Sequence, residues 1–137
     1  MYLVVEALMS LSDGSPAFTP DQQQKFNLAK KGFTKMIELA KKYELKIALG
    51  SDTFLSKAAY DLQALEWTAR AKLSSSAEVM KQATSIGAEL IELSGERNRY
   101  KEGPFGVVQE GDYADLIIVE GNPLKDVTIL SEPEQKP

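Results

Sequence analysis

The amino-acid sequence predicts an α/β protein in which a strand, a helix and a second strand are followed by two further helices and a small β layer. The first observation is a nearly continuous apolar run, Tyr2 to Ala7, typical of a strand covered on both faces. The second is an amphipathic stretch with helical periodicity, and the third is another apolar run, Lys46 to Gly50. Strands joined by a helix lie parallel with a right-handed crossover, so these two runs are predicted to be neighbours in a sheet.

The first predicted helix has a well-marked beginning. After a loop over residues 12–16, Thr19 is the predicted N-cap, Pro20 occupies the first helical position, and Gln22 is placed to close a capping box. The helix is expected to end near Tyr43. Apolar residues recur every three or four positions and therefore share one face of the helix, which is expected to pack against a sheet. They are Phe26, Ala29, Phe33, Ile37, Ala40 and Tyr43.

Two further helices are predicted in the middle of the chain. Apolar residues at helical spacing from Ala58 to Ala69 indicate a helix that ends near Lys72. Ser75 and Glu78 form a second capping box, which opens a helix that we expect to continue until Gly95.

Beyond this point the pattern changes to short apolar runs separated by glycines. Val107–Val108 and Leu116–Val119 are predicted to be strands of a small, separate β layer. The sequence therefore divides into residues 1–95 and residues 96–137, with the end of the chain polar and proline-bearing.

Composition limits the classes of function. The chain is 43% hydrophobic and 26% charged, with a net charge of -4, and it contains no histidine and no cysteine. Its densest basic stretch, residues 30–42, alternates with apolar residues as a solvated helix face does, which argues against nucleic acid as a partner. No apolar run approaches the ~20 residues of a membrane span, and we expect a cytoplasmic protein.

Asp52 is the candidate functional residue. It ends the segment Gly50-Ser51-Asp52, directly after an apolar run, and reactive groups in α/β folds gather at the carboxyl ends of strands. The alternative is structural, since aspartate is also well suited to a helix N-cap or a turn. Ser51 and Thr53 are interpreted as turn formers, because no base is present to activate a hydroxyl.

The order of several segments resembles the C-terminal part of a metal-dependent amidohydrolase, nearest to the imidazolonepropionase-like and Xaa-Pro dipeptidase (prolidase-type) branch. The segments are Ala48-Leu49-Gly50-Ser51-Asp52, Met80-Lys81-Gln82-Ala83-Thr84 with Ala88-Glu89-Leu90, Gly106 to Val119, and Gly121-Asn122-Pro123-Leu124. The resemblance runs from about Tyr2 to Leu130.

The resemblance implies a fold and a site. It implies a partial (β/α)₈ TIM barrel, comprising the last two strands (Tyr2 to Ala7 and Lys46 to Gly50) and their helices, followed by a small β-sandwich segment from Gly106 to Val119. A complete barrel takes roughly 250 residues, so about the first six strands are missing. Asp52 is the one matching position among the family's metal ligands. The resemblance assigns it to metal binding and to proton transfer from the attacking water to the leaving amine.

The cofactor implied is Zn²⁺ or another divalent metal in the full-length enzyme. Such sites need three or more protein ligands, mainly imidazole and carboxylate. Because this chain has no histidine, we expect it to bind no metal alone and to be inactive alone. Its expected partners are the missing N-terminal portion of the barrel or a second copy, and the full enzyme would take a small amide or dipeptide.

Two other carboxylates have structural interpretations. Asp115 precedes an apolar run of the predicted β layer and is interpreted as a turn residue. Glu66 lies among the inward positions of its helix, and if buried it needs a partner or a raised pKa. The sequence alone does not name that partner.

Two other classes of function stay open. The first is a non-catalytic α/β interaction or oligomerisation module derived from such an enzyme, because uncovered strand edges and apolar surfaces pair readily with another chain. The second is a small stand-alone enzyme using Asp52 without metal, for which the sequence offers no nucleophile and base pair.

Overall fold

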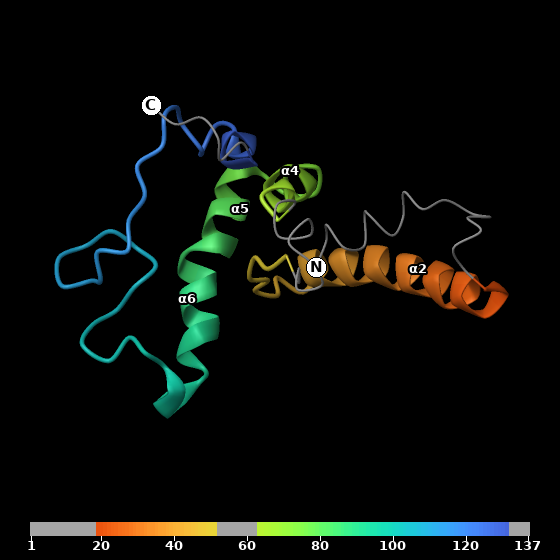
Figure 1. Cartoon of the computed structure of the whole chain (residues 1–137), viewed down its shortest axis with the longest axis horizontal. Helices are drawn as coiled ribbons and strands as arrows, with labels where there is room; N and C mark the ends of the chain where they lie inside the picture. The colour runs from red at the N-terminus through yellow and green to blue at the C-terminus, as the bar shows by residue number, and fades with distance from the viewer. Residues whose placement is uncertain (1–18, 52–62, 132–137) are drawn as a thin grey trace.

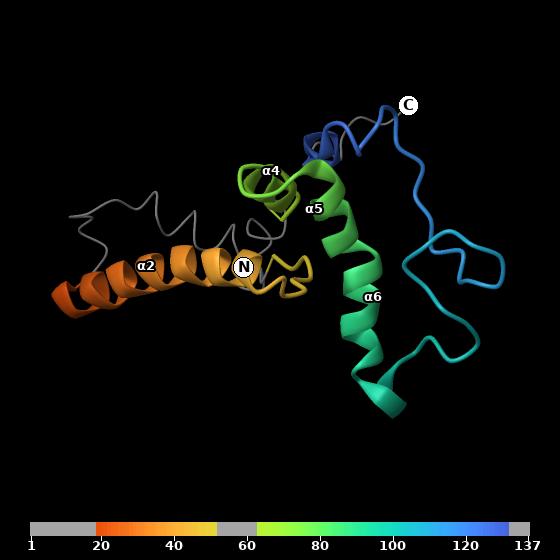
Figure 2. The same cartoon turned by 180° about the vertical axis from the view of Figure 1, so that it is seen from behind.

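The structure is a computed structural model that describes residues 19–51 and 63–131. Its elements are helices α2 (Pro20–Lys42), α4 (Leu65–Ala71), α5 (Ser76–Ala83) and α6 (Ser85–Glu92), and the short 3₁₀ helices η1 (Gly95–Arg97) and η2 (Val127–Ser131). Figures 1 and 2 show α5 and α6 as one bent rod, with α2 on one side of it and the chain beyond η1 on the other.

The predicted α/β fold class is wrong for the part of the chain that the structure describes. Lys46–Gly50, Val107–Val108 and Leu116–Val119 were predicted as strands, but these segments have no regular secondary structure, and no strand occurs within residues 19–51 and 63–131. The described residues form neither a portion of a TIM barrel nor a β-sandwich segment. The predicted first strand, Tyr2 to Ala7, lies outside the described residues.

The error has a physical cause. A short apolar run indicates burial on both faces, but a strand also needs a neighbouring strand to bond its backbone N–H and C=O groups. In the run that starts at Leu116, the Leu116 N–H instead donates to the Ala114 carbonyl, 2.9 Å away, in a local turn. The apolar pattern is present, but in the described structure no neighbouring strand pairs with this segment.

Helix α2 confirms the predicted start. The Gln22 N–H donates to the Thr19 hydroxyl at 3.3 Å, and the Thr19 N–H donates to the Gln22 side chain at 2.9 Å, which completes the capping box. Among the positions of the predicted face whose burial the structure describes, Ala40 near the end of the helix is buried, whereas Tyr43 is exposed. The part of this face around Ala40 borders a cavity, and no sheet covers the face in the described structure.

Helices α5 and α6 replace one predicted helix. The Ser75 and Glu78 capping box is confirmed, with the Ser75 N–H 2.8 Å from the Glu78 carboxylate. The helix breaks at Thr84, whose φ and ψ are -114° and -94°. Its hydroxyl donates to the Met80 carbonyl at 2.8 Å, a back-bond that bends helices.

The small core lies where α4, α5 and η2 meet. Val79 on α5 and Val127 on η2 are both fully buried. The Ser76 hydroxyl accepts a hydrogen bond from the Val127 N–H at 3.1 Å, and the Thr68 and Ser131 hydroxyls lie 2.7 Å apart. Figure 1 shows the end of the described chain returning to α4 and α5 in this way. The division of the chain after residue 95 stays a prediction, although η2, from the second predicted domain, packs on helices of the first.

The chain from 98 to 120 contacts the helices at a glycine. Gly106 has a φ of +87°, and a Cβ there would lie 2.6 Å from the Ala88 Cβ and 2.9 Å from the Thr84 carbonyl oxygen. Only a residue without a side chain allows this approach. Further along, Ile117 and Ile118 are 81% and 101% exposed.

Candidate functional site

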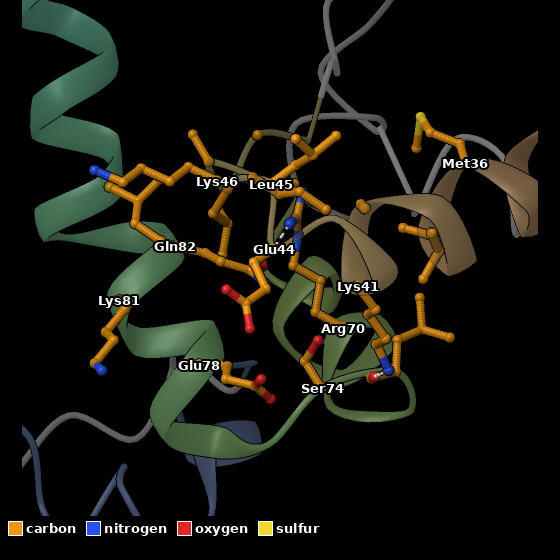
Figure 3. Close-up of a pocket in the computed structure, with 18 of the residues that line it drawn as sticks. Met36, Lys41, Glu44, Leu45, Lys46, Arg70, Ser74, Glu78, Lys81 and Gln82 are labelled. Carbon is orange, nitrogen blue, oxygen red and sulfur yellow. Dashed lines mark hydrogen bonds between the residues drawn. The ribbon is translucent and has the colours of Figure 1, made fainter.

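Asp52, the predicted catalytic and metal-ligating residue, lies outside the described residues. The segment that leads to it is described, and residues 44–50 form one wall of a cavity of about 990 Å³. The other walls come from the last turns of α2 and from α4, α5 and α6 (Figure 3). Gly50, two positions before Asp52 in the sequence, is the last residue of this wall.

A tight helix end directs the chain along the cavity. The Leu45 N–H donates to the Ala40 carbonyl at 2.9 Å, and the Glu44 N–H donates to the Lys41 carbonyl at 3.3 Å. These two bonds are those of a Schellman motif, which requires a left-handed residue that is usually glycine. Here that residue is Glu44, with φ 50°.

Two contacts fix the wall formed by residues 44–50 to the helices, and a third joins α2 to the chain beyond α4. The Leu49 N–H donates to the Gln82 carbonyl at 2.8 Å. The Lys46 ammonium pairs with Glu89 on α6, with both side chains largely exposed. The Lys41 ammonium, on α2, donates to the carbonyl of Leu73, two residues beyond α4. The backbone bond carries most of this connection, because exposed ion pairs contribute little.

A buried polar network lies at the base of the cavity. Glu66 is only 1% exposed, and its carboxylate accepts a hydrogen bond from Arg70 Nε at 2.8 Å. Arg70 Nη1 donates in turn to the Gln82 side-chain oxygen at 2.7 Å, which connects α4 to α5. The expectation that Glu66 is buried with a partner is confirmed, and the partner is Arg70.

The charged groups around the cavity are mainly positive. Four cationic and two acidic side chains border it: Lys41, Lys46, Arg70 and Lys81 with Glu44 and Glu78. The Glu78 carboxylate accepts hydrogen bonds from the backbone N–H of Ser75 and from its hydroxyl, and these bonds lower the Glu78 pKa from 4.5, which keeps it negatively charged. Lys81 has no bonded partner within the described ranges 19–51 and 63–131.

Asp115, interpreted as a turn residue, lies outside the cavity wall. Its carboxylate accepts a hydrogen bond from the Tyr100 hydroxyl at 2.9 Å, and this bond is the main cause of a raised Tyr100 pKa. The Tyr100 ring stacks on Phe105 at 3.9 Å and meets Tyr113 edge-on at 5.0 Å. These contacts give Asp115 a role in holding the loop together.

Sequence reasoning missed two residues of this network, Arg70 and Gln82. Arg70 had a usable signal, because it lies four positions after Glu66, the spacing at which helical side chains pair. Gln82 had none, since its contacts come from segments distant in sequence.

Within the ranges 19–51 and 63–131, no group of three or more histidine, cysteine, aspartate or glutamate side chains is arranged to hold a metal ion. None of the described helices is both long enough and apolar enough to cross a membrane. No protein-family model matches the chain, and neither the curated proteins nor the solved structures provide a significant match.

Proposed function

We propose that this chain is the C-terminal portion of a cytoplasmic metal-dependent amidohydrolase that cleaves a C–N bond in a peptide or cyclic amide. The ordered resemblance of its segments, from Ala48–Asp52 to Gly121–Leu124, is the observation that carries the proposal. The structure contributes one supporting feature: Leu116, Ile117 and Ile118 are exposed, as expected of a surface that another polypeptide covers.

In this proposal Asp52 is the acid–base residue. Its carboxylate takes a proton from water as the water oxygen attacks the amide carbon, and it delivers that proton to the nitrogen as the C–N bond breaks. A divalent cation, when bound, supplies Lewis-acid activation of the water and the carbonyl. The histidine ligands come from another portion of the enzyme, so the chain alone is proposed to be inactive.

The family that the chain resembles carries an His-x-His pair of metal ligands on its first barrel strand, so the test begins with the reading frame upstream of Met1, which should encode such a pair. That polypeptide, mixed with this chain and zinc, should hydrolyse dipeptides. Asp52→Asn should abolish the activity, whereas Asp115→Asn, outside the cavity wall, should retain it. A frame without the histidine pair, or a mixture in which Asp52→Asn is fully active, contradicts the proposal.

A second candidate is a non-catalytic module that associates with itself or another chain. The observation that favours it is the same apolar run, where Ile117 and Ile118 are 81% and 101% exposed. Sedimentation of the chain alone should then show oligomers that Ile118→Lys dissociates. Gln109→Lys adds the same charge at another exposed position and should leave the oligomers intact. A monomeric wild-type chain contradicts self-association and leaves only association with a different chain.

A further inference from the structure

The cavity contains a cation whose donors are only partly used. A guanidinium carries five N–H donors in a planar fork. Arg70 Nε bonds to Glu66 and Nη1 bonds to Gln82, whereas Nη2 has no partner within the described ranges. The Arg70 side chain is only 12% exposed, so water has limited access to those donors. Figure 3 shows Arg70 reaching from α4 into the middle of the cavity.

The remaining walls are largely apolar. Aliphatic and aromatic side chains from four segments border the same space: Phe33, Ile37, Ile47, Leu73, Ile86 and Leu90. The volume, about 990 Å³, lies at the upper end of the range for small-molecule sites, roughly 300–1,000 Å³. Such a lining favours a ligand with an apolar body.

The unused guanidinium donors of Arg70 favour an anionic head group. Four cationic side chains face two acidic ones around the cavity. Glu78, bonded by Ser75 in the helix cap, stays ionised, and Lys46 is paired with Glu89. The head group is therefore directed to the Arg70 donors that Glu66 and Gln82 leave unused. Lys81 adds a positive charge on α5, close enough to Glu78 to contribute to the lowered pKa of that carboxyl.

We propose that this cavity binds a small monocarboxylate with an apolar chain, whose carboxylate bonds to Arg70 Nη2 and whose chain lies against the aliphatic wall. Arginine suits this role because its charge-assisted hydrogen bonds to carboxylates are short and strong. The proposal goes beyond the hydrolase assignment and does not depend on it.

Hexanoate and hexanamide are the matched probes, because they share the apolar chain and differ in charge. Each is titrated into the full chain while the Arg70 Nε–H signal and the indole signal of Trp67, the single tryptophan, are followed by NMR. Hexanoate should shift the Arg70 signal saturably at millimolar concentration, with hexanamide about tenfold weaker. Equal binding of the two probes, or no saturable shift, overturns the proposal.

Two variants separate a binding role from a structural one. Arg70→Lys keeps the charge but loses the fork, and should weaken hexanoate binding about tenfold. Glu66→Gln keeps an acceptor for Arg70 but removes the competing negative charge, so hexanoate binding should strengthen several-fold. Unchanged or weaker binding in Glu66→Gln overturns the proposal, even if Arg70→Lys fails to fold. Lys35→Gln, an exposed change on α2 away from the cavity wall, should bind as the wild type does.

Discussion

Two regions of the molecule use apolar residues in opposite ways. The cluster of α4, α5 and η2 buries Val79 and Val127 completely, whereas the segment from 98 to 120 leaves Ile117 and Ile118 in solvent. The cluster succeeds because helices satisfy their own backbone hydrogen bonds before they pack. An apolar segment without helical periodicity lacks that independence, and in the described structure it stays uncovered.

The largest expected effect is at the buried ion pair of the cluster. Arg70→Ala leaves the Glu66 carboxylate buried without its guanidinium, and removing one partner of a buried pair costs about 3 kcal/mol or more. Urea unfolding followed by Trp67 fluorescence measures the loss. Arg97→Ala, at an exposed arginine, should change the free energy of unfolding by less than about 0.5 kcal/mol. Similar losses in the two variants would contradict the assigned burial.

A matched valine pair tests the comparison directly. Val79→Ala removes buried methyl groups and should lower the free energy of unfolding by about 2 kcal/mol, because it loses transfer energy and leaves a void. Val108→Ala makes the same chemical change where the side chain is 83% exposed, and should have an effect near zero. If Val108→Ala were the more damaging, the 98–120 segment would have a core of its own.

The N-terminal cap of α5 should contribute less to the free energy of unfolding than the buried residues do, and its contribution should depend on pH. Ser75→Ala removes the hydroxyl that bonds the Glu78 N–H and carboxylate, at a cost of about 1 kcal/mol near neutral pH.

Because folding lowers the Glu78 pKa from 4.5, the ionised form is favoured in the folded state. That contribution is fully present above about pH 4.5 and is lost as the pH falls through the lowered pKa. The difference between wild type and Ser75→Ala should therefore shrink in acid. Glu78→Gln, which does not titrate, should lack this pH dependence; a gap between wild type and Ser75→Ala that widens in acid would contradict the cap geometry.

The smallest expected effect is an increase in stability. Glu44→Gly removes a side chain from a left-handed position and should stabilise the end of α2 by about 0.5–1 kcal/mol. Glu44→Ala retains a Cβ and should give none of this gain. Thermal unfolding monitored by circular dichroism compares the two, and an equal gain in both would show that the lost charge, and not the backbone, is responsible.

The parts of this structure that could be predicted from sequence are local. The capping boxes at Thr19 and Ser75 join residues three apart, so the sequence alone carries the whole interaction. The strands were predicted wrongly because pairing depends on a distant partner that no apolar run reveals. The cavity was also unpredictable, since its walls come from segments that only the fold brings together.

Gln82 couples local opening of the 44–50 wall to the packing of α4. Its side chain bonds Arg70 on α4, while its carbonyl bonds the Leu49 amide in the 44–50 wall. Exchange of the Leu49 amide with deuterium requires that second bond to open. Loss of the Arg70 contact should therefore accelerate exchange at Leu49, so that one backbone amide reports the integrity of a helix to which it is not directly bonded.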